Sequence, residues 1–84
     1  MQELKDLPNV GKVLEAALRT CGIDTVDHFK SLGSREVFLR IRRQVDPGAC
    51  LSMLYGIQGA IDGVRGHALP KDVKADLKQF FYSL

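Results

Sequence analysis

Four side chains in this sequence could serve as a nucleophile, an acid–base group or a metal ligand, namely Cys21, Cys50, His28 and His67. No two of them stand at a spacing typical of a catalytic or metal-binding pair, and the sequence has no CxxC or HxxxH signature. The glycines between positions 56 and 66 follow a helix-like stretch rather than a strand, so they do not form a phosphate-binding loop. We therefore predict that the chain is not an enzyme and binds no metal and no cofactor.

Both cysteines lie at apolar positions of predicted helices, which is typical of reduced, buried thiols in an intracellular protein. The two histidines are predicted to be solvated. The chain opens with charged residues, unlike a signal peptide, and this favours a cytoplasmic location.

The net charge of +2 hides a local excess of positive charge between residues 35 and 45. This basic block holds four arginines against the single acid Glu36, and its members are Arg35, Arg40, Arg42 and Arg43. A basic block on one helix is typical of a surface that contacts phosphate, although a solvated helix face can carry the same residues.

The element expected at the centre of the fold is an uncharged stretch of fifteen residues, 47 to 61. Asp46 as N-cap and Pro47 at the first helical position predict that a helix begins there. Its apolar stripe predicts the core face and comprises Cys50, Met53, Leu54, Ile57, Ile61 and Val64. The run is shorter than the roughly 20 apolar residues of a membrane span, so no membrane association is predicted.

The other two faces of this helix differ in side-chain size. One carries only small residues, which lets a neighbouring helix approach closely; they are Ala49, Ser52, Gly56, Gly59, Ala60 and Gly63. We expect the helix at 70–81 to cover that face. The last face, with Leu51, Tyr55, Gln58 and Asp62, is expected to point at solvent.

Apolar periodicity and capping signals predict four further helices. The first spans residues 12–19, ends at Gly22 and buries a stripe of Val10, Val13, Leu14, Ala17, Leu18 and Cys21. Two short helices follow, one capped by Thr25 and ended by Gly33, the other capped by Ser34 with Val37, Phe38 and Ile41 buried and Leu39 on its arginine-bearing side. The last directs Val73, Leu77, Phe80 and Phe81 to the core. We predict an all-α, compact five-helix domain that occupies residues 1–84, with Met53, Leu54, Ile57, Phe80 and Phe38 among its buried residues.

The turn Leu7-Pro8-Asn9-Val10-Gly11 before the first long helix resembles a helix-hairpin-helix motif. Such a turn requires a positive φ at Asn9 and an open backbone at Gly11, and it leaves amides exposed at a helix N-terminus, where an anion such as phosphate is favoured. The predicted nucleic-acid contacts are therefore Asn9, Val10, Gly11 and Lys12, together with Arg35, Arg40, Arg42 and Arg43.

Several sequence blocks together resemble the C-terminal domain of the TfoX/Sxy family. They are residues 7–11, Gly22-Ile23-Asp24-Thr25-Val26, Leu32-Gly33-Ser34, Leu51 to Ile61 and Leu69-Pro70. The resemblance covers nearly the whole chain. It implies a SAM-like or helix-hairpin-helix-like fold and a role in natural competence, in which members of the family are associated with transcription activation alongside the cyclic-AMP receptor protein.

Two binding functions remain open at this point. The first is a regulatory domain in competence and transcription that contacts the DNA phosphate backbone without sequence specificity. The second is a protein-interaction module in which Leu39, Tyr55 and the arginines bind a transcription factor or a second copy of the chain, since arginine and tyrosine are enriched at such contacts. The sequence leaves the oligomeric state undecided.

Overall fold

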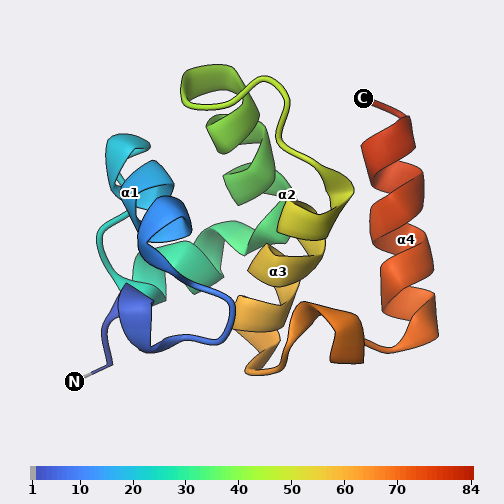
Figure 1. Ribbon diagram of the computed structural model, residues 1–84, viewed down its shortest axis with the longest axis horizontal. Helices are drawn as coiled ribbons and strands as arrows, with labels where there is room; N and C mark the ends of the chain where they lie inside the picture. The colour runs from blue at the N-terminus through green and yellow to red at the C-terminus, as the bar shows by residue number, and fades with distance from the viewer. Residues whose placement is uncertain (1) are drawn as a thin grey trace.

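The structure, a computed structural model, describes residues 2–84, which form four α-helices and two short 3-10 helices and contain no strand. In chain order the elements are η1 (Leu4–Asp6), α1 (Lys12–Thr20), α2 (Val26–Gln44), α3 (Leu51–Asp62), η2 (Gly66–Ala68) and α4 (Lys71–Tyr82). Helix α3 lies in the middle of the molecule, with α1 and α2 on one side and α4 on the other (Figure 1). The all-α prediction is confirmed, and the resemblance to SAM-like folds stays a prediction.

Helix α1 ends as the sequence predicted. Gly22 has a φ of 78°, and its amide donates to the Arg19 carbonyl while the Ile23 amide donates to the Leu18 carbonyl, both at 2.9 Å. This pair of bonds is the Schellman arrangement that ends many helices. The prediction that Val13 is buried was wrong, because Val13 lies about 100° around the helix from Leu14 and is 79% exposed.

The two short helices predicted between residues 25 and 43 are continuous as α2, and its two segments meet at a kink at Gly33, where the backbone is non-helical (φ 80°, ψ 162°) at the residue predicted to end the first of them. Residues 2–84 therefore contain four α-helices instead of the five that were predicted. Thr25 caps α2 as expected, since its hydroxyl accepts from the His28 amide at 3.1 Å. Ser34 does not act as the predicted cap, because its buried hydroxyl donates to the side-chain oxygen of Gln58 and so joins α2 to α3.

Helix α3 begins four residues later than predicted. The Asp46 carboxylate accepts from the Gly48 amide at 2.9 Å, which closes a local turn instead of capping a helix at Pro47. Cys50 is the N-cap of α3, and it is exposed rather than buried as predicted. The helix ends at Gly63, whose φ of 79° suits glycine.

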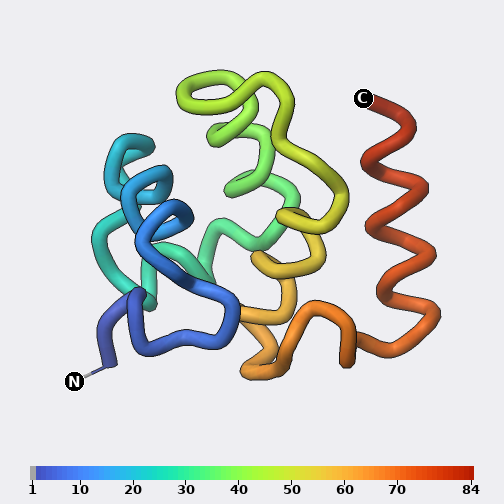
Figure 2. The backbone as a smooth tube through the Cα atoms, viewed as in Figure 1, coloured from blue at the N-terminus to red at the C-terminus, as the bar shows by residue number. Residues whose placement is uncertain are grey.

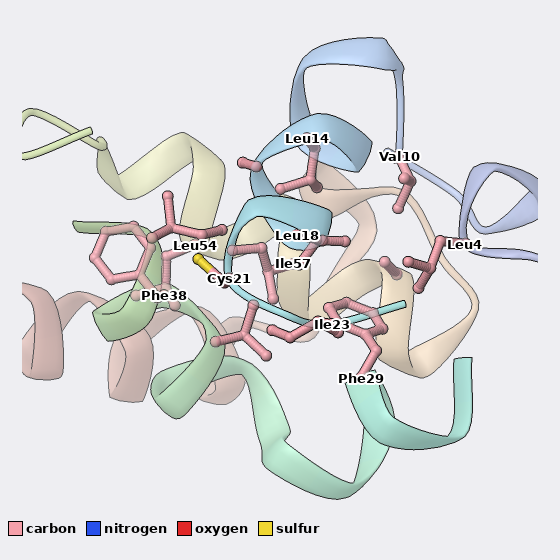
Figure 3. Close-up of a cluster of buried hydrophobic side chains, with 14 of the residues drawn as sticks. Leu4, Val10, Leu14, Leu18, Cys21, Ile23, Phe29, Phe38, Leu54 and Ile57 are labelled. Atoms are coloured by element: carbon pink, nitrogen blue, oxygen red, sulfur yellow. The ribbon is translucent and has the colours of Figure 1, made fainter. Parts of the chain in front are cut away.

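The core is formed mainly by aliphatic side chains from α1, α2 and α3 (Figure 3). Phe38, Leu54 and Ile57 are fully buried as predicted, and so are Val37 and Ile41. Met53 and Phe80, also predicted to be buried, are only partly buried. The N-terminal segment contributes Leu4 and Leu7, which the sequence analysis did not place in the core.

The predicted surroundings of two faces of α3, a helix on the small face and solvent on the face with Tyr55, were wrong. The small face is covered by the turn before α1 and by the segment that leads into η2, since a Cβ added at Gly59 would lie 2.5 Å from the Val64 carbonyl oxygen. Helix α4 packs instead near the face that was expected to point at solvent. The Tyr55 hydroxyl donates to the Lys74 carbonyl at 3.3 Å. The backbone trace shows how the chain after α3 turns back under the helix before α4 rises beside it (Figure 2).

A single side chain, that of Asn9, joins the turn to these segments. Its amide nitrogen donates to the carbonyl oxygens of Gly56 at 3.1 Å and Val64 at 2.9 Å, and its carbonyl oxygen accepts from the Gly66 amide at 3.3 Å. The backbone of Asn9 has the predicted positive φ, 67°, in the region that asparagine tolerates better than most residues. We call this set of three hydrogen bonds the Asn9 clamp.

The clamp predicts opposite effects for the same substitution at two glycines of α3. A methyl group at Gly59 would lie 2.7 Å from the Asn9 amide nitrogen, whereas one at Gly56 would be in ordinary contact at 3.6 Å with the Asn9 Cβ. Gly59→Ala should therefore lower the free energy of unfolding by about 1 to 3 kcal/mol. Gly56→Ala should leave it unchanged or raise it by up to about 1 kcal/mol, because alanine is the better helix former. Urea unfolding followed by circular dichroism measures both, and equal effects would contradict the packing described.

Replacement of Asn9 separates its hydrogen bonds from its backbone conformation. Asn9→Gly keeps the positive φ but loses the clamp, and should cost about 1 to 3 kcal/mol of unfolding free energy. Asn9→Ala should cost about 1 to 2 kcal/mol more, because alanine resists the left-handed region. Thr20→Ala is the control, since it removes an exposed bond at 2.9 Å to the Ala16 carbonyl. A value for Asn9→Gly no larger than that for Thr20→Ala would show that the clamp stabilises nothing.

Candidate nucleic-acid interface

The turn before α1 leaves backbone amides open to solvent. Gly11 is the N-cap, and neither its amide nor that of Lys12 has a hydrogen-bond partner among residues 2–84. The Val10 amide is already engaged with the Leu7 carbonyl at 3.3 Å, and the Asn9 side chain points into the clamp. Of the four residues predicted here, Gly11 and Lys12 thus have open amides, while Asn9 and Val10 use their polar groups within the fold.

A polar groove of about 700 Å³ lies beside this turn. Two basic residues that the sequence analysis did not select, Lys5 and Arg65, line it and are exposed. Lys5 makes an exposed contact with Glu3 at 3.6 Å, an interaction that contributes little when solvated. Asp6 also lines the groove, and its carboxylate accepts from the Glu3 amide at 2.9 Å. We call this surface the basic groove.

Lys5 and Arg65 lie 60 residues apart in the sequence, so no local pattern could have paired them. Arg65 follows Gly63 and Val64, and the Asn9 clamp fixes this segment against the turn. The sequence feature nearest to Arg65 is the pair Gly63 and Gly66, which indicates a tight connection after α3. This pair does not indicate which part of the fold the connection contacts.

The four arginines of the basic block divide over two faces of α2. Arg35 lies 5.5 Å from the ring centre of Phe80, and Arg42 lies 5.8 Å from that of Phe38 and 5.7 Å from that of Phe81. These two guanidinium groups therefore stack on aromatic rings, and two of those three rings belong to α4.

The other two arginines share one carboxylate. The Arg40 Nε lies 2.8 Å from a Glu36 oxygen and an Arg43 nitrogen lies 3.7 Å from the same atom. The hydrogen bond from Arg40 lowers the pKa of Glu36, so this acid remains ionised at neutral pH. The trio carries a net charge of one positive unit rather than two.

The turn and this trio belong to different elements. Lys12 begins α1, whereas Glu36, Arg40 and Arg43 lie in α2. None of these three lines the groove beside the turn. The predicted nucleic-acid residues therefore form two separate clusters, not one.

The predicted protein contacts, Leu39 and Tyr55, are both half-buried. Tyr55 packs against the core and its hydroxyl is bonded to α4. Leu39 lies in the second half of α2.

His28 and His67 are exposed, Cys21 is buried, and within residues 2–84 no three His, Cys, Asp or Glu side chains are grouped so that they could hold a metal ion. No helix in this part of the chain is long and apolar enough to cross a membrane.

Two solved structures of Listeria monocytogenes proteins closely resemble this chain. One, in a triclinic crystal form, has a TM-score of 0.93 and is 45% identical in sequence. The match covers 98% of this chain and 92% of the Listeria chain. The other, in a tetragonal form, has a TM-score of 0.89 and is 46% identical, and the match covers 94% of this chain and 96% of the Listeria chain. The helical arrangement is thus shared with proteins solved by experiment.

Two curated proteins are more distant relatives. Protein Sxy of Escherichia coli K12 is 36% identical over 83 residues, and DNA transformation protein TfoX1 of Aliivibrio fischeri is 30% identical over 78 residues. The chain spans only 39% and 37% of their respective lengths. The family described as the TfoX C-terminal domain matches residues 1–81. The chain therefore belongs to the TfoX C-terminal domain family.

Proposed function

We propose that this chain is a non-enzymatic regulatory binding domain, 1–84, that acts in the control of competence for DNA transformation and of transcription. The support is its membership of the TfoX C-terminal domain family and its relationship to a protein named for DNA transformation. A cytoplasmic location fits two cysteines that form no disulfide.

The same proposal includes contact with the DNA phosphate backbone at the turn before α1. The observation that carries it is the open N-terminus of α1, where the amides of Gly11 and Lys12 lie at a turn whose groove is lined by two basic side chains, Lys5 and Arg65. Helix N-termini favour anions because of the helix dipole and the unpaired amides. A Cβ placed on Gly11 would meet no atom within 4 Å, so a phosphate oxygen can approach the backbone closely.

Such binding is nonspecific. The groups at the turn are backbone amides, lysines and an arginine that recognise phosphate rather than base edges. A few phosphate contacts give a dissociation constant of about 10⁻⁴ to 10⁻⁶ M at physiological salt. Arg40 and Arg43 provide a second contact on α2, whereas Arg35 and Arg42 contribute less because they stack on aromatic rings.

The alternative is a protein-interaction module that uses Leu39 and Tyr55 to bind a transcription factor or a second copy. It has weaker support, because the Tyr55 hydroxyl is bonded to the Lys74 carbonyl and the ring packs against the core.

The DNA proposal is tested with two triple variants that remove the same charge. Lys5→Gln/Lys12→Gln/Arg65→Gln removes the cations at the turn, and Lys30→Gln/Lys71→Gln/Lys78→Gln removes three exposed lysines elsewhere. The first should reduce the slope of log affinity against log salt by about 2 to 3 and should weaken binding equally for unrelated duplexes. The second should change the slope by less than about 1. Fluorescence anisotropy at several salt concentrations measures both.

Equal losses in the two triple variants would mean that the turn is not the contact surface. A smaller pair of variants tests the second cluster. Arg40→Gln/Arg43→Gln should lower the slope by about 1 to 2, and Arg35→Gln should leave it nearly unchanged.

A further inference from the structure

A second groove lies on the other side of the turn, between the N-terminal ends of α1 and α3. Its volume is about 380 Å³, and its walls are mainly apolar, formed by Val13, Leu14, Met53, Cys50 and Gly56. We call it the apolar groove. It is distinct from the basic groove, but Asn9 and Gly11 line both, so the two surfaces adjoin at the turn.

The apolar groove has an exposed apolar rim that folding does not explain. Val13 is 79% exposed, the highest value among the large hydrophobic side chains that are exposed. Met53 is half-buried beside the groove, and methionine adapts its shape to varied partners. The exposed Val13, the half-buried Met53 and the exposed Cys50 thus form an apolar edge next to a polar surface, an arrangement that a binding partner can cover.

One lysine and a helix N-terminus give this apolar surface a positive edge. Lys12 is the one charged residue that lines the apolar groove, and it makes no ion pair with any residue from 2 to 84. The positive end of the α1 dipole lies at the same place. Beyond the turn, Lys5 and Arg65 extend the positive surface along the basic groove.

We propose that the apolar groove binds an acidic amphipathic helix from a partner protein. The apolar face of that helix inserts between Val13 and Met53, and its carboxylates face Lys12 and the α1 N-terminus. A nucleic-acid backbone presents the negative charge but not the continuous apolar face, so it would leave Val13 in contact with water. This inference goes beyond the DNA contact proposed above and shares only Lys12 and the α1 N-terminus with it.

The test uses a fluorescein-labelled model peptide of about 16 residues, with leucines at helical spacing on one face and glutamates on the other. Fluorescence anisotropy should show that Val13→Ser weakens its binding about ten-fold, because the valine methyl groups lose their burial. Val45→Ser is the matched control, since Val45 is also an exposed valine, 43% accessible, outside the groove. Val45→Ser should leave the affinity for the peptide within about two-fold of the unsubstituted protein.

The charge requirement is tested in the same assay. Lys12→Gln should weaken peptide binding several-fold, and a peptide with lysines in place of glutamates should bind at least about ten-fold more weakly than the acidic peptide.

Duplex DNA, titrated in parallel, distinguishes this inference from the DNA proposal. Val13→Ser should leave DNA affinity unchanged, since it removes no charge, whereas the triple variant at Lys5, Lys12 and Arg65 should weaken it. Equal peptide affinity for Val13→Ser and Val45→Ser would overturn the inference. So would equal binding of the acidic and basic peptides, or a loss of DNA affinity in Val13→Ser without any peptide binding. Both valines are exposed, so thermal melting should show two folded variants.

Discussion

Three hydrogen bonds made by one asparagine join segments that are far apart in the sequence. The Asn9 clamp joins the N-terminal turn to backbone groups that lie 47, 55 and 57 residues further along the chain. It satisfies two carbonyl oxygens and one amide in a partly buried region, where unpaired polar groups would be costly. The close contacts around the clamp also require residues without a side chain at Gly59 and Gly66. A Cβ at Gly59 would lie 2.7 Å from the Asn9 amide nitrogen, and one at Gly66 would lie 3.2 Å from backbone atoms of Tyr55 and Gly56. The small face of α3 therefore serves close contact with a turn and a connecting segment, and α4 packs elsewhere.

The basic block shows how sequence composition can overstate the charge available to a ligand. Four arginines within nine residues are visible in the sequence, but their partners are not. Phe80 and Phe81 come from α4, some 40 residues away, and Glu36 is shared by Arg40 and Arg43. Two of the four arginines thus help to hold α4 against α2, and two are partly neutralised. Lys12 and Arg65 make no such pair with any residue from 2 to 84 and lie at the turn, where the helix dipole adds to their positive charge.

Features governed by neighbouring residues could be predicted from the sequence. Gly22 ends α1, Thr25 caps α2, Gly33 breaks it, and Phe38, Leu54 and Ile57 are buried, because capping, glycine conformation and helical periodicity act within a few residues. Features governed by distant residues could not. Ser34 satisfies the local rule for a cap, yet its hydroxyl bonds to Gln58 in α3. Asp46 and Pro47 satisfy the rule for a helix start, yet the carboxylate closes a turn with Gly48. In the candidate site, the positive φ of Asn9 was predictable from the sequence. The hydrogen-bond partners of Asn9 were not, and neither was the meeting of Lys5 and Arg65 at the basic groove.

The position of Asn9 between two grooves has a consequence for regulation. The basic groove and the apolar groove adjoin at Asn9 and Gly11, and the clamp joins this turn to α3 and to the segment before η2. Lys12 lines the apolar groove and follows Gly11, which lines both grooves. Under the two proposals above, a phosphate backbone and an acidic helix would therefore compete for the same ammonium group and the same helix N-terminus. Competition of this kind does not require a conformational change, because each ligand excludes the other by charge and by occupied space. On these two proposals, binding of the acidic helix would release DNA, with Lys12 contributing to both complexes and Val13 to only one.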